Sequence, residues 1–385
     1  MINITFLLPI QSPYYTRRLE CLSLHDDLKL TLLLERSTFS HRPGWKHEPI
    51  NGVSVEVLGS QVLATASNGG DLGYQIHGIR SIPWKLSIAL WRLRPDIVVL
   101  CNATQLLLAL PFKWLVGGCF VLVVEDTPHA TRNLSGFRSL VKKWIYQRAD
   151  NFLAFSEDAK CFLNKMGIRR GIQRSSWSLD MAEFRPDKTD FIVDKCQYPN
   201  RRDRVVIFVG AFIINKGVLL LLEAWNKLPL LVRENSKLLM VGSGSMRADM
   251  EIYIRENELA EVEILGQLPY TQVRDLLRSS DFLVLPTLQD LFSLTVLEAM
   301  ACGCPVITTP YNGARELVNE GENGWLVDPT KPGALTSVLE SALSDQTDLR
   351  EMGRKARERV EQMDNTIVMN EFAQVLRNLV STRNI

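Results

Sequence analysis

Short apolar runs alternate with helix-length segments along most of the chain. Residues 2–9, 28–34 and 97–100 are apolar at most consecutive positions, and residues 15–24 between them have helical spacing. Strands that are apolar on both faces are typical of a parallel sheet covered by helices on both sides. The pattern therefore predicts an α/β protein in which strands and helices alternate.

The alternation is interrupted once, by the polar residues 187–203, and a buried strand begins again at residues 205–209. We interpret residues 187–203 as a linker. It separates an N-terminal Rossmann-like domain, residues 1–186, from a C-terminal Rossmann-like domain, residues 204–365. The chain of 385 residues is long enough for both domains to have a core.

Composition narrows the range of functions only slightly. Hydrophobic residues make up 46% and charged residues 23%, as in ordinary globular proteins, and the net charge of +1 gives no indication of a nucleic-acid partner. The seven cysteines are odd in number and lack paired spacing, which favours a reducing, cytoplasmic location.

Neither a signal peptide nor a membrane span is expected. Residues 1–10 are apolar but short and lack a positively charged start, so they predict a first strand. The longest apolar tract, residues 97–124, contains Asn102, Pro111 and Lys113. It therefore predicts a strand, a helix and a second strand rather than a span of about 20 residues.

Residues 281–316 combine structural and chemical signals. Two buried strands, at residues 282–285 and 305–309, flank a helix that starts near Thr295. Ligands bind at the carboxyl ends of such strands, where Asp290 in the loop and Glu298 in the first helical turn would lie. Two simpler interpretations remain open. Asp290 is a solvated loop acid, or Thr295 and Glu298 form a capping box.

This stretch resembles the C-terminal signature of GT4-type retaining glycosyltransferases, the glycosyltransferase group 1 family. The matching residues are Pro286-Thr287, Asp290, Phe292, Glu298-Ala299-Met300-Ala301, Gly303 and Pro305-Val306. The chain departs from the pattern at Asp290, where the family usually has Glu, and at Leu291 and Ser293, where it usually has Gly. The resemblance implies the GT-B fold, two Rossmann-like domains facing across a cleft, with residues 366–385 forming a helix that packs back on the N-terminal domain.

The resemblance also implies roles in the C-terminal domain, which would hold a nucleotide-diphosphate-sugar. Glu298 would bind the ribose hydroxyls, and Asp290 would act on the donor sugar as a catalytic residue. The remaining donor-binding residues implied are Gly210, Lys216, Leu268, Ser293, Leu294 and Thr295. Lys216 would bind the diphosphate, although Ala211 stands where the family usually has Arg.

In the N-terminal domain, His129 follows a strand at residues 120–124, and the resemblance implies that it faces the donor sugar as a second catalytic residue. A structural or solvated histidine is the alternative. Glu125 and Asp126 are candidates for acceptor hydroxyls. Tyr14 and Arg17, in the first loop and helix, are further acceptor candidates, and Tyr15 and Arg18 beside them could also face the cleft. A solvated helix face is the alternative for both arginines.

The implied activity is retaining transfer of a hexosyl group to a saccharide or lipid-linked saccharide acceptor, in cell-envelope or exopolysaccharide biosynthesis. The sequence contains no Asp-x-Asp motif, and we expect neither a metal nor another cofactor. Two alternatives stay open: a nucleotide-sugar epimerase on the same fold, and a non-catalytic protein that binds a nucleotide-sugar or a partner. A nicotinamide dehydrogenase is not expected, because no Gly-x-Gly-x-x-Gly follows a strand.

Residues 136–148 predict a helix that carries basic and aromatic side chains, among them Lys142, Lys143, Trp144 and Arg148. Such a helix can rest on an anionic membrane surface, here the cytoplasmic face of the inner membrane. A solvated helix face explains the same residues.

Overall fold

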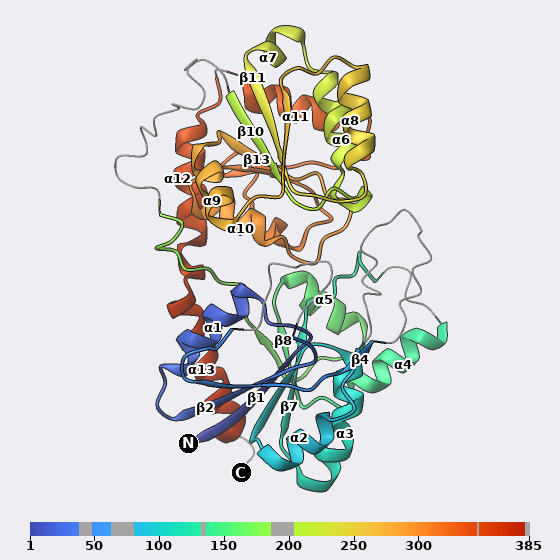
Figure 1. Cartoon of the computed structure of the whole chain (residues 1–385), viewed down its shortest axis with the longest axis vertical. Helices are drawn as coiled ribbons and strands as arrows, with labels where there is room; N and C mark the ends of the chain where they lie inside the picture. The colour runs from blue at the N-terminus through green and yellow to red at the C-terminus, as the bar shows by residue number, and fades with distance from the viewer. Residues whose placement is uncertain (38–47, 63–80, 132–135, 186–203, 345, 382–385) are drawn as a thin grey trace. The chain divides into compact units, whose positions relative to one another are not determined.

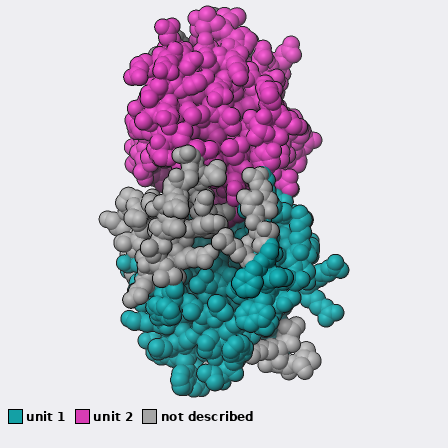
Figure 2. Space-filling model, turned by 90° about the vertical axis from the view of Figure 1, so that its right-hand side faces the viewer, with its two compact units in different colours: residues 1–66, 77–180, 363–385 teal, residues 67–76, 181–362 magenta. Residues whose placement is uncertain are grey.

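The computed structural model describes residues 1–37, 48–62, 81–131, 136–185, 204–344 and 346–381 (Figure 1). These residues form two compact units (Figure 2). The N-terminal unit takes its described residues from Met1–Ala66, His77–Asp180 and Met363–Ile385, and the C-terminal unit from Met181–Gln362. The expected linker, residues 187–203, lies outside the described residues.

In its described part, the N-terminal unit contains a parallel sheet with the strand order β3-β2-β1-β6-β7-β8-β9. The strands are β1 (Ile2–Leu8), β2 (Leu28–Leu34), β3 (Val53–Val57), β6 (Ile97–Leu100), β7 (Cys119–Val124), β8 (Asn151–Ala154) and β9 (Ile172–Arg174). A short antiparallel pair joins β4 (Gln61–Val62) to β5 (Ser81–Ile82). All residues of β6 and β7 are buried, as expected for central strands covered on both faces.

The helices of the N-terminal unit follow the expected rhythm. They are α1 (Pro13–Ser23), α2 (Leu86–Leu93), α3 (Ala103–Val116), α4 (Gly136–Tyr146), α5 (Glu157–Lys165) and α13 (Asn365–Ser381). The tract at residues 97–124 forms β6, α3 and β7, so the expected strand, helix and strand are confirmed. Helix α3 begins where the Asn102 side chain accepts a hydrogen bond from the Gln105 N–H at 2.9 Å.

The last helix, α13, belongs to the N-terminal unit, although the chain reaches it only after the C-terminal unit. It packs on α1 (Figure 1). The rings of Phe6 and Phe372 lie 6.3 Å apart, and Arg377 donates two hydrogen bonds to the Asp27 carboxylate, at 2.8 and 2.9 Å.

The described residues of the C-terminal unit form a second parallel sheet, with the order β12-β11-β10-β13-β14-β15. Its strands are β10 (Arg204–Val209), β11 (Ser236–Val241), β12 (Val262–Gly266), β13 (Phe282–Val284), β14 (Val306–Thr308) and β15 (Gly324–Leu326). Its helices are η2 (Ile214–Lys216), α6 (Val218–Asn226), α7 (Leu230–Glu234), α8 (Arg247–Glu256), α9 (Tyr270–Ser279), α10 (Leu294–Ala301), η3 (Gly313–Leu317), α11 (Ala334–Leu343) and α12 (Leu349–Val360), and η4 (Glu361–Met363) follows.

Both sheets reverse their strand order at one place. In the N-terminal sheet the reversal lies between β1 and β6, and in the C-terminal sheet between β10 and β13. At such a point the loops leaving two adjacent strands diverge, which opens a crevice at the carboxyl ends of the strands. The fold therefore directs attention to the loops that follow β1 and β6 and to those that follow β10 and β13.

Candidate active site

The loops that follow β10 and β13 are fastened to each other. The backbone oxygen of Asn215 accepts hydrogen bonds from the Leu288 N–H and the Thr287 hydroxyl, both at 2.8 Å. Gly217, which precedes α6, has φ +69°, and a Cβ atom on it would lie 2.1 Å from the Pro286 oxygen. Only glycine permits this approach of the two backbones.

The same two loops bring together two of the predicted site residues. The Nζ atom of Lys216 forms an ion pair with a carboxylate oxygen of Asp290, and the two side chains retain 21% and 15% of their exposure. The backbone of Asp290 is held by the loop after β14, since its N–H donates to the Tyr311 oxygen at 3.0 Å and its oxygen accepts from the Gly313 N–H at 3.2 Å. Asp290 is therefore a fixed, partly buried carboxylate, and the interpretation as a solvated loop acid is wrong.

Asn312, which the sequence reasoning missed, organises the start of α10. Its buried side-chain oxygen accepts hydrogen bonds from the backbone N–H groups of Ser293, at 3.1 Å, and Ala314, at 3.0 Å. Its amide nitrogen donates to the Thr308 hydroxyl at 3.0 Å. The sequence signal was the Asn312-Gly313 pair after a strand, which indicates a turn but not what the turn holds.

Helix α10 begins one residue earlier than expected. Its first residue is Leu294 and its N-cap is Ser293, whose side chain makes no capping hydrogen bond. Thr295 is thus already inside the helix, and the capping-box interpretation of Thr295 and Glu298 is wrong. Glu298 is 4% exposed, so a carboxylate is enclosed within the unit directly behind the helix start.

The other predicted donor residues lie at the same edge of this sheet. Gly210 directly follows β10, and its N–H donates to the Val241 oxygen at 3.0 Å. Leu268 is half-buried in the loop after β12. Leu294 and Thr295 are half-buried in the first turn of α10. The predicted site residues of the C-terminal unit thus follow the carboxyl ends of its strands, and all except Leu268, which follows the edge strand β12, belong to the segments after β10 and β13.

In the N-terminal unit, one arginine departs from the expectation. Arg18 is only 4% exposed, so the solvated-face interpretation is wrong for it, whereas the Arg17 side chain is 57% exposed and pairs with Glu20 at 3.3 Å. The Arg18 guanidinium lies 5.0 Å from the ring centroid of Phe155 and 5.5 Å from that of Trp177. Stacking of this kind retains a buried cation.

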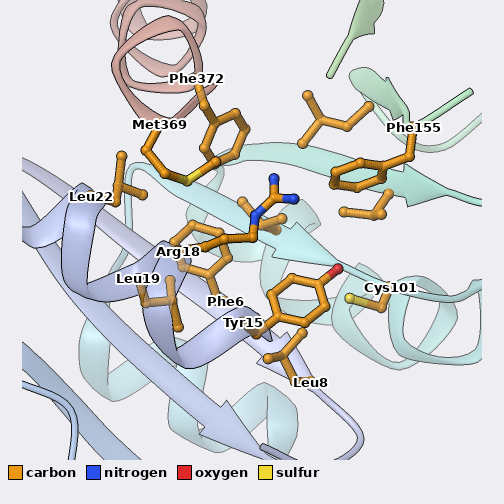
Figure 3. Close-up of a pocket in the computed structure, with 13 residues that line it drawn as sticks. Phe6, Leu8, Tyr15, Arg18, Leu19, Leu22, Cys101, Phe155, Met369 and Phe372 are labelled. Atoms are coloured by element: carbon orange, nitrogen blue, oxygen red, sulfur yellow. The ribbon is translucent and has the colours of Figure 1, made fainter. Parts of the chain in front are cut away.

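Arg18 lines a small cavity of about 20 Å³ that is otherwise largely apolar (Figure 3). Its guanidinium donates a hydrogen bond to the Ser176 oxygen at 2.9 Å. Figure 3 shows the ring of Tyr15 reaching toward Cys101, across the reversal of strand order between β1 and β6. The helical spacing contained a signal, because Arg18 lies one turn before Leu22 on the buried face of α1, whereas Arg17 lies off that face.

Burial and neighbouring charges shift the pKa values of Glu125 and Arg18 in the N-terminal unit. Burial, and next the charge of Asp126, raise the pKa of the Glu125 carboxyl to about 7, although the Arg18 charge opposes the rise. Burial lowers the pKa of Arg18 to about 10. A carboxyl group with a pKa near neutrality can both accept and donate a proton at neutral pH, so Glu125 could exchange a proton with a bound hydroxyl. A carboxyl group with the ordinary pKa of 4.5 would be ionised at that pH.

The remaining predicted residues of the N-terminal unit have different surroundings. Asp126 accepts hydrogen bonds from Lys142 Nζ and from the Tyr146 hydroxyl, both at 2.9 Å, so its carboxylate is fastened to α4. His129 is half-buried in the turn after β7, and Tyr14 is half-buried in the first turn of α1. The described residues contain no group of three or more His, Cys, Asp or Glu side chains that could hold a metal ion.

Comparisons with known proteins fit this arrangement. Residues 194–359 match the family model described as glycosyl transferases group 1. An uncharacterized glycosyltransferase of Methanocaldococcus jannaschii, MJ1178, is 31% identical over 152 residues, which cover 40% of this chain and 42% of that protein. The putative colanic acid biosynthesis glycosyltransferase WcaL of Escherichia coli is 28% identical over 248 residues, 61% of this chain and 58% of that protein. The chain thus spans well under two thirds of the length of these relatives.

A solved structure shares the whole fold. Anabaena Alr3699/HepE in complex with UDP and glucose superposes with a TM-score of 0.75 at 17% identity, over 98% of this chain and 100% of that chain. The likeness shows the fold, and the family model covers the segment that carries Lys216, Asp290 and Glu298. Residues 194–359 of this chain thus match the glycosyltransferase group 1 family, and the chain has the two-domain GT-B fold.

Proposed function

We propose that this chain transfers a sugar from a nucleotide-diphosphate-sugar to a saccharide or lipid-linked saccharide acceptor. The observation that carries the proposal is the meeting of Lys216, Asp290 and the start of α10 at the reversal of strand order in the C-terminal unit. These residues lie in the segment that matches the group 1 family model. The solved complex of HepE with UDP and glucose supports the same class of donor here.

The nucleotide part of the donor would bind to the C-terminal unit. Lys216 supplies a compact positive charge for the diphosphate, and the N-terminus of α10 adds the partial charge of its helix dipole. Glu298 supplies carboxylate oxygens that accept from the ribose hydroxyls. Gly210 lets the backbone approach the donor, and Leu268 gives an apolar wall for the base.

The sugar part would meet Asp290. In the ligand-free protein Lys216 neutralises this carboxylate. A bound diphosphate would compete for Lys216, so that the Asp290 carboxylate could accept hydrogen bonds from the sugar hydroxyls and stabilise an oxocarbenium-like transition state. His129 is assigned to the same sugar from the N-terminal unit, and Tyr14, Arg17, Glu125 and Asp126 to the acceptor.

Retention of anomeric configuration, transfer of a hexose and independence of metal ions come from the family resemblance and belong to this proposal. The name of WcaL supports a role in cell-envelope or exopolysaccharide synthesis. We assign this role to the cytoplasmic face of the membrane. Analysis of the anomeric proton of the product by NMR tests retention, and turnover in excess chelator tests metal independence.

The donor site is tested by thermal unfolding with UDP, GDP, ADP, dTDP and NAD. A ligand present at 100 times its Kd and bound only by the folded state adds about 2.7 kcal/mol to the free energy of unfolding. One nucleoside diphosphate should stand out, and Glu298→Gln should remove its effect. Glu340→Gln is the matched control, because Glu340 is exposed on α11.

No shift with any diphosphate at millimolar concentration would overturn the donor site. Isomerised nucleotide-sugar formed without an acceptor would instead identify an epimerase. Binding without turnover on any acceptor would identify a non-catalytic protein.

A further inference from the structure

Three neighbouring helices of the N-terminal unit expose large apolar side chains in addition to those that they bury in the core. On α4 the exposed residues are Phe137, Leu140, Val141 and Trp144, at 79%, 66%, 38% and 44% exposure. Their spacing of three and four residues places them on one face of the helix. The apolar stripe of α4, which would normally face a core, is therefore turned outward.

Helices α2 and α3 repeat this arrangement. At α2 the exposed residues are Trp84, Ile88 and Trp91, and on α3 they are Leu107, Trp114 and Leu115. Helix α3 packs against both α2 and α4, and the Ser87 hydroxyl donates to the Leu108 oxygen at 2.6 Å (Figure 1). We name the exposed apolar residues of the three helices the α2–α4 apolar face.

The charge around this face is positive. Residues 84–94, 103–118 and 136–149 contain no Asp or Glu. They carry these basic residues: Lys85, Arg92, Arg94, Lys113, Arg138, Lys142, Lys143 and Arg148. Since the whole chain has a net charge of only +1, the positive charge is concentrated on these helices. Two of the basic residues on α2 and α3 are paired within the unit, Arg92 with Glu56 and Lys113 with Asp150. The other basic residues, among them the exposed Lys85 and Arg94, let the face complement a negatively charged partner.

The basic residues of α4 do not all serve this face. Lys142 pairs with Asp126 at 2.9 Å and lies 4.9 Å from the ring centroid of Phe162, so its charge is engaged within the unit. Arg148 lies 4.4 Å from the ring centroid of Trp144, at the border of the exposed stripe. Of the basic and aromatic residues expected on the membrane side of residues 136–148, Trp144 and Arg148 therefore remain on this face and Lys142 does not.

We propose that the α2–α4 apolar face docks on the surface of an anionic lipid bilayer. Tryptophan side chains, of which this face has Trp84, Trp91, Trp114 and Trp144, prefer the boundary between headgroups and acyl chains. Lysine and arginine at the border meet the lipid phosphates. The described helices include none that is long and apolar enough to cross a membrane, so the contact lies on the surface.

A bilayer fits this face better than a protein partner does. A protein interface usually has an apolar core inside a mixed polar rim, whereas these helices carry basic residues and no acidic ones beside their apolar stripes. An anionic bilayer supplies one sign of charge above an apolar interior. The proposal does not depend on glycosyl transfer, but it would bring the enzyme to an acceptor that is held in a membrane.

The test is sedimentation of the full chain with vesicles of phosphatidylcholine alone or with about 30% phosphatidylglycerol added. The wild type should bind the anionic vesicles and lose binding in high salt. Trp114→Gln with Leu115→Gln should lower the partition coefficient at least about tenfold, because two large apolar side chains no longer enter the bilayer. Brominated lipids should quench the tryptophan fluorescence of the bound wild type.

The matched control is Leu230→Gln with Leu231→Gln, a pair on α7 that is also exposed, at 60% and 72%. It should bind vesicles as the wild type does. Unchanged vesicle binding of the Trp114/Leu115 variant would overturn the proposal. So would a wild type that does not bind vesicles but self-associates, if the variant abolishes the self-association. Both variants should keep the thermal shift of the wild type with a nucleoside diphosphate, so a failed donor site is distinguished from a failed membrane surface.

Discussion

Lys216 and Asp290 form an ion pair although 74 positions of sequence separate them. They meet because β10 and β13, which their loops follow, are adjacent strands at the reversal of strand order. Each has been assigned to a different part of one ligand, the diphosphate and the sugar. Binding of the whole donor must therefore exchange this ion pair for two new contacts.

This exchange predicts opposite effects for the two partners. Asp290→Asn removes the competing carboxylate, so affinity for a nucleoside diphosphate should stay the same or rise, while sugar transfer falls at least about a hundredfold. Lys216→Ala removes a charge-assisted contact and should weaken diphosphate binding by about 1.5–3 kcal/mol. Calorimetric titration and initial rates measure the two quantities. Equal loss of diphosphate affinity in both variants would contradict the exchange.

The close approach at Gly217 predicts a second effect, on stability. Gly217→Ala adds a Cβ atom 2.1 Å from the Pro286 oxygen to a backbone with φ +69°, so the two loops must move apart. We expect the free energy of unfolding to fall by more than about 3 kcal/mol, as measured by urea titration.

Gly333 is the control for Gly217, since it has φ +76° with nothing within 4 Å of the added atom. Gly333→Ala should therefore lose only the about 1–2 kcal/mol that a left-handed backbone costs a residue with a side chain. Equal losses at the two positions would mean that the contact with Pro286 contributes nothing.

The sequence predicted the elements, and it placed the candidate donor residues in one short segment, because these signals are local. Buried strands such as β10 and β13 are apolar at consecutive positions. Asp290 and Glu298 are close in sequence, within one strand–loop–helix segment. The ion pair of Asp290 with Lys216 had no such signal. It depends on which strands are neighbours, and hydrophobic periodicity does not contain the order of strands.

Asn312 illustrates the same limit and gives a third prediction. Asn312→Ala would leave the Ser293 and Ala314 N–H groups buried without their acceptor, which should cost about 2–4 kcal/mol of stability. The start of α10 would also lose its anchor, so diphosphate affinity should fall with it. Asn226→Ala is the comparison, since it removes one part-buried hydrogen bond to Asn257 and should cost about 1 kcal/mol. A loss no larger than that of Asn226→Ala, with diphosphate affinity unchanged, would contradict the anchoring role.

A solvated helix face was the alternative for Arg18, because a charged residue in an amphipathic helix usually lies there. Its actual position depends on Phe155 and Trp177, which follow β8 and β9 and are more than a hundred residues away. Only the folded sheet brings these rings around the guanidinium. The same enclosure places a charge near Glu125, whose titration could not be inferred from its neighbours in sequence.

Glu125 therefore gives a prediction about pH. Its pKa in the folded protein is about 7, above its ordinary value of 4.5, because burial and Asp126 disfavour the ionised form. The neutral form thus contributes stability that is fully present below pH 4.5 and is lost as the pH rises through about 7. Glu125→Gln keeps a neutral side chain at every pH, so at pH 8 it should be more stable than the wild type by up to about 3 kcal/mol.

The measurement is the free energy of unfolding from urea titrations between pH 4 and pH 8. The wild-type curve should fall relative to that of Glu125→Gln between pH 4.5 and 7 and then run parallel to it. Glu157→Gln, at a carboxylate that is 57% exposed on α5, is the comparison for the loss of an exposed charge. If the Glu125→Gln and wild-type curves are parallel over the whole range, the pKa of Glu125 in the folded protein is not raised above its ordinary value. Glu125 would then carry no proton near neutral pH that it could exchange with an acceptor hydroxyl.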